Sequence, residues 1–335
     1  MRPSPTGPAI FEPSRWLRWP HGQTAWSPLF RSQTPPEARQ VYWPTPDGDR
    51  LSVWLRQESD SAPWVLLLHG LEGCSRSNYI VGLRSAFAAL GWNVAALEFR
   101  SCDGMLNSAP RLYHSGETTD LALVVSELQS RLGARELYLV GFSLGGNVVA
   151  KWLGECGDGV GEIVIAAALV SPPFDLTVSG PAIDRALSGL YVRRFLRTLI
   201  PKGLAKARQF PGLLDEPKIA ASRTFEEFDT WATAALHGFD DAWDYWEKVG
   251  CGQFLAAVRV PTLIVAAEDD PFNPASSLPR EICNDSPWLH PRFSARGGHV
   301  GFVYGAPWGT RHWAEEQVFA FFERMRTLSG TTGNS

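Results

Sequence analysis

The hexapeptide GFSLGG at residues 141–146 restricts the fold of this chain more than any other stretch of its sequence. It follows an apolar run at 136–140 that has the length of a buried strand, and a helical pattern continues from it through 147–153. Such a sharp turn from strand into helix holds Ser143 in a strained backbone conformation, and its flanking glycines are required because a Cβ would collide there. The serine oxygen is then exposed above a helix N-terminus, which stabilises developing negative charge.

Composition narrows the class of protein. The 335 residues are 44% hydrophobic and 20% charged, which suits one large domain or one domain that carries an insertion. A net charge of -4 offers no electrostatic basis for binding nucleic acid. The five cysteines show no metal-binding spacing, so we expect reduced thiols in a soluble, cytoplasmic protein. The N-terminus lacks an apolar signal segment, and the longest apolar run, 163–170, is too short to cross a membrane.

Strand and helix patterns alternate along most of the chain. This order predicts an α/β fold with a mostly parallel eight-stranded sheet that has helices on both faces and begins with an antiparallel hairpin. The expected strands are 40–43, 51–55, 63–68, 93–97, 136–140, 163–170, 260–266 and 288–293, and the expected helices are 79–90, 117–132, 147–153 and 313–326.

The alternation is interrupted once. Residues 175–258 carry helical patterns and no buried strand, so we expect a helical cap inserted into a core made of 37–174 and 259–328. Residues 1–36 are rich in Pro, Trp and Arg and are expected to form an extended arm, and 329–335 are expected to be a disordered tail.

A serine hydroxyl needs a base, and the base an orienting acid, before its oxygen becomes nucleophilic. The acid is expected after the strand that follows the cap, where three consecutive carboxylates stand: Glu268, Asp269 and Asp270. Asp270 is preferred because it lies beyond the strand end and directly before a proline; Asp269 is its closest competitor. A solvated loop end or a helix N-cap would explain these carboxylates without catalysis.

His299 is the candidate base among seven histidines. It follows the last expected strand, and glycines on both sides of it allow the loop to fold over the serine. His290 falls within that strand pattern and His312 beside the final helix, whereas the remaining four precede the acid in the chain. His299 is therefore the residue in the right position for a Ser-Asp-His order.

Backbone N–H donors are also needed to bind the oxyanion of a tetrahedral intermediate. One should be the amide of Leu144, directly after the serine, and the second that of Leu71 in His69-Gly-Leu-Glu-Gly73, which follows a buried strand. His69 itself is expected to hold this loop by hydrogen bonds rather than to transfer protons. No metal or organic cofactor is implied.

With these residues in place, the chain resembles the YheT-like family of α/β hydrolases, which is related to the eukaryotic ABHD-type acylglycerol and phospholipid hydrolases. The resemblance extends over roughly residues 10–326. It rests on the segments 21–24, 69–73, 99–104, 113–118, 141–147, 224–229, 237–239, 269–272 and 297–302, in this order. Two segments depart from the family pattern: Arg100-Ser-Cys102, usually Arg-Gly-Cys, and 243–246, often rich in paired tyrosines. Both departures concern pocket shape, which leaves the substrate size open.

The resemblance implies the α/β-hydrolase fold and a serine hydrolase that cleaves carboxylic esters, short-to-medium-chain or acylglycerol-like, through an acyl-enzyme. The alternatives are thioester, amide or C–C bond cleavage by the same residues, or a catalytically silent binding module. The expected partner is a small ester or lipid.

Residues 185–214 hold seven basic and no acidic residues. This charge would allow transient contact with a lipid interface, although a solvated face on a packed cap helix is the simpler interpretation. Cys102 is expected to be structural.

Overall fold

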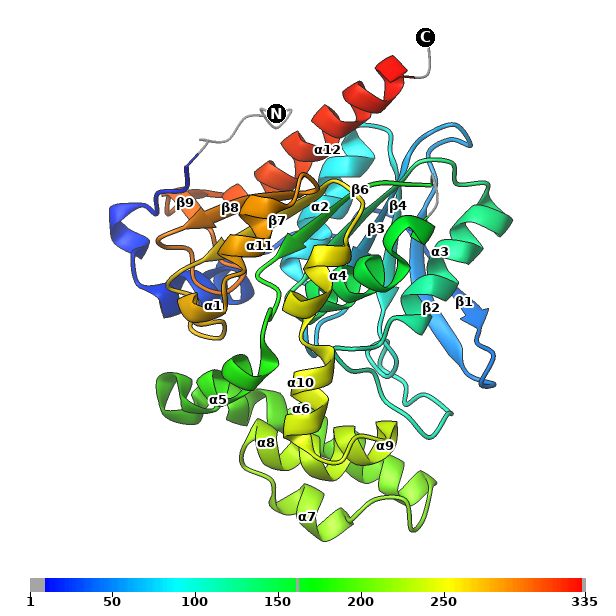
Figure 1. Ribbon diagram of the computed structural model, residues 1–335, viewed down its shortest axis with the longest axis vertical. Coiled ribbons are helices and arrows are strands. Elements are labelled where there is room, and N and C mark those ends of the chain that lie inside the picture. Colours follow the sequence, from blue (N-terminus) through cyan, green and yellow to red (C-terminus); the bar gives the residue numbers. More distant parts are fainter. Residues whose placement is uncertain (1–9, 161–162, 333–335) are drawn as a thin grey trace.

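Eight strands form one mixed sheet at the centre of the molecule (Figure 1). The structure, a computed structural model, describes residues 10–160 and 163–332. The strand order is β1-β2-β4-β3-β5-β6-β7-β8; β2 pairs antiparallel with β1 and β4, and every other pair is parallel. The strands are β1 Arg39–Pro44, β2 Arg50–Arg56, β3 Trp64–Leu68, β4 Asn93–Glu98, β5 Leu137–Phe142, β6 Val164–Val170, β7 Thr262–Ala267 and β8 Leu289–Ser294. The predicted fold class is confirmed.

The central strands are apolar throughout because both faces of the sheet are covered. In β3 every residue is buried; Trp64, Leu66 and Leu68 point into one core, and Val65 and Leu67 point into the other. Alternate side chains of a strand point to opposite faces, so a strand buried on both sides reads as an uninterrupted apolar run. This explains why 63–68 and 163–170 stand out in the sequence as blocks rather than as alternating patterns.

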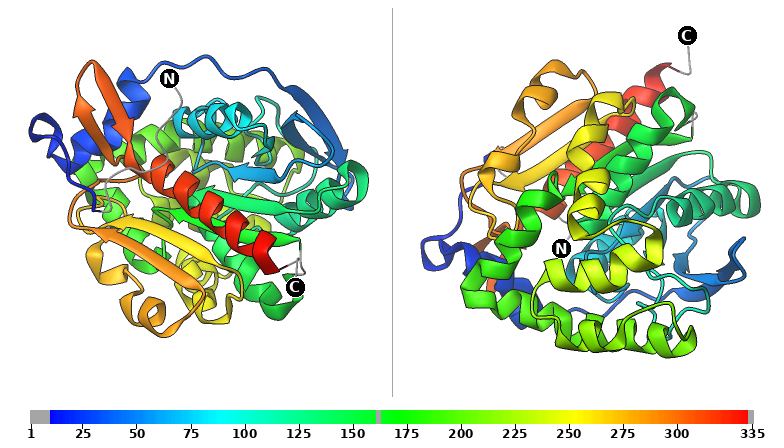
Figure 2. Two further views of the ribbon diagram at one scale, coloured as in Figure 1. Left: turned by 90° about the horizontal axis from the view of Figure 1, so that it is seen from above. Right: turned by 60° about the horizontal axis from the view of Figure 1, so that its bottom comes forward.

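Helices cover the two faces of the sheet. One face packs against α2 (Asn78–Ala89) and α12 (Trp313–Thr332), and the other packs against α3 (Thr119–Leu132), α4 (Leu144–Cys156) and α11 (Arg280–Asp285). Figure 2 shows α12 running across the sheet, where it contacts β6 and β7. The two layers hold the carboxyl ends of β3, β5 and β7 in one place, and a parallel sheet of this type carries its binding site at that edge.

Between β6 and β7 the chain is helical, and we call this region the cap. Its helices are α5 Leu176–Arg185, α6 Leu190–Gln209, α7 Glu216–Ala221, α8 Phe225–Phe228, a π-helical turn Asp229–Ala234, α9 Ala235–His237 and α10 Ala242–Val249. They form a separate layer at one end of the body (Figure 1) with an apolar core of their own, to which Leu196, Phe228 and Trp246 belong.

The basic stretch of the cap lies mostly in α6. In α6 the apolar Val192, Leu196 and Leu199 are buried, whereas Arg193 and Arg197 are exposed. The apolar face of this amphipathic helix is therefore occupied by packing within the protein, and its arginines are solvated.

Three parts of the chain differ from expectation. The arm is not extended throughout, because residues Pro20–Phe30 form the helix α1. Pro20 suits the first helical position. The buried Gln23 side chain donates to the carbonyl oxygen of Val303 and accepts from the amide of the same residue. The tail prediction was wrong for 329–332, which continue α12, since no helix-breaking proline intervenes; residues 333–335 lie outside the described part. A hairpin of β9 (Val303–Ala306) and β10 (Gly309–His312) was not predicted.

Candidate active site

The glycine-rich hexapeptide forms the predicted turn from β5 into α4. Ser143 has φ 51° and ψ -119°, which places it outside the regions that side-chain-bearing residues ordinarily adopt. A Cβ on Gly141 would lie 2.3 Å from the carbonyl oxygen of Gly145, and a Cβ on Gly145 would lie 2.6 Å from the carbonyl oxygen of His69. Both neighbours are backbone atoms that cannot rotate away, so these two positions require glycine.

Ser143, His299 and Asp270 meet in one hydrogen-bonded chain, although 156 residues separate the serine from the histidine. The Ser143 hydroxyl lies 2.9 Å from Nε2 of His299, and Nδ1 of His299 lies 2.8 Å from Oδ2 of Asp270. The carboxylate can only accept, so Nδ1 carries the proton and Nε2 is left to accept from the serine. The Asp270 side chain is 2% exposed and that of His299 is 10% exposed, so the chain is shielded from water but reachable at the serine.

The structure distinguishes the three consecutive carboxylates. Asp270 is the one that reaches His299, and its other oxygen accepts from the amides of Phe272 (2.8 Å) and Asn273 (3.2 Å). Asp269 instead accepts from the amide of Gly298 at 2.9 Å. Burial raises the pKa of Asp269, and its contact supports the loop that carries the histidine. Glu268 forms an exposed ion pair with Arg280. Asp270 is therefore the member of this run in position to orient the imidazole.

Leu71 and Leu144, the expected oxyanion donors, line the same pocket as Ser143. The loop that carries Leu71 passes close to the serine, since a Cβ on Gly70 would lie 3.2 Å from the Ser143 Cβ. Within the described part of the chain, neither amide takes part in a backbone hydrogen bond of the loops and turns. The Leu144 amide is also the first of α4, where unpaired N–H groups and the helix dipole favour negative charge.

His69 is a buried, neutral structural residue, as predicted. Its Nδ1 donates to the carbonyl oxygen of Gly70 at 2.7 Å, and its Nε2 accepts from the amide of Phe99 at 3.2 Å. Burial lowers the pKa of His69 to about 4. The imidazole thus ties the loop after β3 to the end of β4 and carries no charge at neutral pH.

Sequence reasoning missed several residues that support this constellation. The amide of His299 donates to Oγ1 of Thr24 at 2.9 Å, so α1 of the N-terminal arm braces the histidine loop. The amide of Val300 donates to Oγ of Ser171 at 3.1 Å, and Gly70 donates to the hydroxyl of Tyr79 at 3.0 Å. The segment 21–24 was part of the family resemblance, which was the available signal for Thr24.

The loop after β3 is also tied to the cap. Glu72 has a positive φ of 55°; its amide donates to the hydroxyl of Tyr113 at 2.7 Å, and that hydroxyl donates back to the Glu72 carboxylate at 2.8 Å. Lys202 of α6 donates to the same carboxylate at 2.7 Å. Cys102 lies beside this group, and burial raises the pKa of its thiol to about 12. Burial thus favours the protonated form of this thiol.

Arg100, in the segment 99–104, is the centre of a buried ionic network. Arg100 donates to both oxygens of Asp120 (2.7 and 2.8 Å) and to Asp49 at 3.2 Å. Burial by itself would raise the pKa of Asp49, but hydrogen bonds from the Asn107 side chain and from backbone amides such as that of Ala109 lower it overall. These side chains are almost fully buried, so the network depends on every partner being present.

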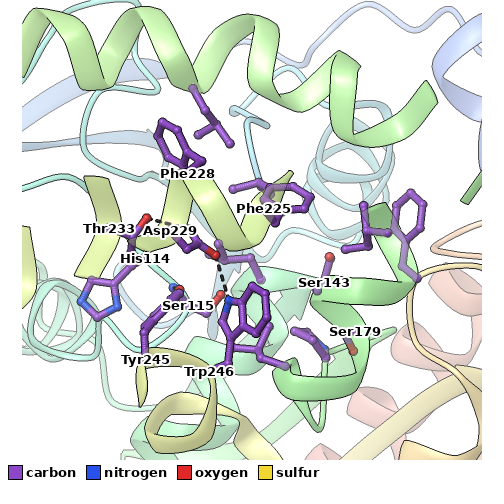
Figure 3. A pocket seen from close by; sticks show the side chains of 18 of the residues that line it. His114, Ser115, Ser143, Ser179, Phe225, Phe228, Asp229, Thr233, Tyr245 and Trp246 are labelled. Atoms are coloured by element: carbon purple, nitrogen blue, oxygen red, sulfur yellow. Dashed lines mark hydrogen bonds between the residues drawn. The ribbon is translucent and has the colours of Figure 1, made fainter. Parts of the chain in front are cut away.

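The pocket above Ser143 lies between the body and the cap (Figure 3). It encloses about 870 Å³ of empty space, its open mouth included. The body contributes residues such as Leu71, Tyr113 and Phe272, and the cap contributes residues such as Leu199 and Phe225.

Among the described residues no group of three or more His, Cys, Asp or Glu side chains is arranged to hold a metal ion. None of the described helices is both long enough and apolar enough to span a membrane.

Comparison with known proteins agrees with this architecture. Residues 63–306 match the alpha/beta hydrolase fold family. YheT of Escherichia coli, which is named as an esterase, is 34% identical over 92% of both chains. The phospholipase ABHD3 of Mus musculus is 28% identical over 96% of this chain and 79% of its own. The esterase Pf2001 of Pyrococcus furiosus has a similar fold, with a TM-score of 0.56, 16% identity and coverage of 86% of this chain and 92% of its own.

The chain therefore belongs to the α/β-hydrolase family, in the branch that includes YheT and ABHD3. The resemblance predicted from the sequence motifs is confirmed.

Proposed function

We propose that this protein is a serine hydrolase that cleaves carboxylic esters through an acyl-enzyme on Ser143. The observation that carries the proposal is the hydrogen-bonded chain from Ser143 through His299 to Asp270 in a pocket lined largely by apolar side chains. The names of its relatives, which include an esterase, a phospholipase and a monoacylglycerol lipase, support the same reaction class.

In the first half of the reaction, Oγ of Ser143 attacks the ester carbonyl carbon while Nε2 of His299 takes the hydroxyl proton. Asp270 accepts a hydrogen bond from Nδ1 throughout, which keeps the imidazole in the required tautomer and stabilises its charged form. The carbonyl oxygen becomes an oxyanion and accepts hydrogen bonds from the amides of Leu71 and Leu144. His299 then returns the proton to the departing alcohol, and the acyl group remains on Ser143.

In the second half, a water molecule loses a proton to His299 and attacks the acyl carbon. His299 then gives that proton to Oγ of Ser143 as the bond between Oγ and the acyl carbon breaks and the carboxylic acid leaves. We further propose that the cap limits access of bulk water to this step and selects substrates, because its residues Leu199, Phe225 and Phe228 line one side of the pocket. Contact of the exposed arginines of α6 with a lipid surface would be a separate property, which sedimentation with anionic vesicles tests.

The test is covalent labelling with a fluorophosphonate probe, combined with hydrolysis of p-nitrophenyl esters. Wild-type protein should be labelled at Ser143, and Ser143→Ala should lose labelling and more than about 10⁴-fold in kcat. The control is Ser179→Ala, which removes another hydroxyl of the same pocket and should leave the label on Ser143. Folded wild-type protein that takes no label would favour the silent module, and faster turnover of thioesters or amides than of matched esters would move the assignment to those substrates.

A further inference from the structure

The cap places one carboxylate, Asp229, in the wall of the pocket. It begins a π-helical turn, Asp229–Ala234, which continues directly from α8. Thr233 lies four residues further along this turn, and its hydroxyl donates to Oδ1 of the carboxylate at 2.7 Å. Single π-helical turns inside α-helices are uncommon and occur frequently at functional sites. The segment 224–229 also belongs to the motifs of the family resemblance, and the proposed chemistry leaves it without a role.

Asp229 is held by neutral partners. Nε1 of Trp246 donates to Oδ2 at 2.8 Å, and Thr233 holds Oδ1. In the described part of the chain no Lys, Arg or His lies within ion-pair distance of this carboxylate, and the charged neighbour that affects it is another acid, Asp184. Burial raises the pKa of Asp229 to about 6. In contrast, Glu72 in the loop after β3 is paired with Lys202.

The carboxylate lines the pocket and keeps acceptor capacity that its two described hydrogen bonds do not use. A carboxylate offers about four acceptor positions, and two are occupied by Thr233 and Trp246. Asp229 is only partly buried, and it lines the same pocket as Ser143. Figure 3 shows its carboxylate between the Thr233 hydroxyl and the Trp246 indole nitrogen, with Phe225 and Phe228 nearby.

We propose that Asp229 is a binding subsite for a hydrogen-bond donor of the substrate, a hydroxyl group remote from the scissile ester. The inference rests on the proposed ester hydrolysis and specifies which esters the site prefers. A hydroxyl that donates to the carboxylate replaces its water, whereas an apolar group at the same place leaves a desolvated charge without a partner. Sites built in this way reject the analogue that lacks the hydroxyl more strongly than an apolar pocket rejects an extra methylene.

The hydroxyl can come from either side of the ester, so the test has two arms. The acyl arm compares p-nitrophenyl hexanoate with its ω-hydroxy analogue, and the alcohol arm compares propyl butyrate with glycerol monobutyrate. For each pair the quantity measured is the ratio of kcat/KM for the hydroxylated ester to that for the plain ester. The variant is Asp229→Asn, which keeps the shape of the side chain and removes its charge.

Thr233→Val is the matched control, because it removes a hydrogen bond to Asp229 and leaves the carboxylate in place. If Asp229 merely fastens Trp246 to the π-helical turn, both variants loosen the cap and lower the rates of both esters of a pair alike. If Asp229 binds the hydroxyl, Asp229→Asn lowers the ratio at least about tenfold in one arm, and Thr233→Val leaves it within about threefold of wild type.

Each outcome bears on the inference separately from the esterase proposal. A drop of the ratio in the acyl arm or in the alcohol arm supports the subsite and identifies the source of the hydroxyl. Wild-type protein that hydrolyses both pairs with ratios unchanged by Asp229→Asn overturns the subsite and leaves the esterase proposal intact. Wild-type protein that hydrolyses none of the four esters, and takes no fluorophosphonate label, contradicts the proposed function itself.

Discussion

Replacing Gly141 by alanine should disrupt the turn that presents Ser143. The added Cβ would lie 2.3 Å from the carbonyl oxygen of Gly145, 2.5 Å from its carbonyl carbon and 2.6 Å from the Cα of Gly146. Favourable contacts between carbon atoms begin at about 3.5 Å, so each of these three contacts is too short by roughly 1 Å. All three atoms belong to the backbone, and no rotamer change can relieve the overlap.

The size of the effect follows from what has to move. Extra methyl groups in a packed interior typically destabilise by about 1–3 kcal/mol when side chains can adjust. Here the first turn of α4 must shift, so we expect a loss of about 3 kcal/mol or more in the free energy of unfolding. A shift of α4 that relieves the overlap also displaces Ser143 from its 2.9 Å contact with His299 and the Leu144 amide from the pocket. We therefore expect a lower free energy of unfolding, a lower rate of labelling at Ser143, or both.

Urea denaturation followed by tryptophan fluorescence measures the first quantity, and the rate of fluorophosphonate labelling measures the second. Gly159→Ala is the control, because no atom lies within 4 Å of its added Cβ, and it should match wild type in both assays. Gly141→Ala protein with wild-type unfolding free energy and wild-type labelling rate would refute the steric reasoning.

Three further predictions concern charged residues. Asp270→Asn should lower kcat about 10⁴-fold in ester hydrolysis because the imidazole loses its orienting acceptor. Asp269→Asn should lower kcat less than about tenfold, because the amide oxygen of the new side chain can still accept from the histidine loop. Equal losses of kcat in the two variants would contradict the assignment of Asp270. Arg100→Met should destabilise by about 3–5 kcal/mol in chemical denaturation, since it leaves the buried Asp120 without its partner; a loss below about 1 kcal/mol would contradict the network. The pKa of Asp49 is lower in the folded protein than in the unfolded chain, where it is about 3.8. The contribution of this carboxylate to stability is therefore complete above about pH 3.8 and is lost as the pH falls below that value. Asp49→Asn should therefore be less stable than wild type at pH 7, with a difference that shrinks below about pH 4, and a difference independent of pH would refute this.

Most of the sheet could be predicted because its signals are local. Each central strand is a short apolar block, and each covering helix carries its own periodic pattern, so their order along the chain predicts a parallel sheet. The hairpin of β9 and β10 escaped prediction because each strand has only four residues and Val303 is the one that is buried. Helix α1 escaped because Gln23, which fixes it to Val303, finds its partner 280 residues away.

Local sequence patterns were enough to predict the serine turn and the candidates for its acid and base. Glycine at 141 and 145 is a steric requirement, and the strand that ends before each candidate sets its place at one edge of the sheet. The choice between Asp269 and Asp270 depended on tertiary structure, because neighbouring residues in a loop point in different directions and only the folded loop shows which one meets the imidazole. Tertiary structure likewise brought Thr24 to the histidine loop, Lys202 to Glu72 and Asp229 into the pocket. These contacts join segments far apart in the chain, and no local propensity encodes them.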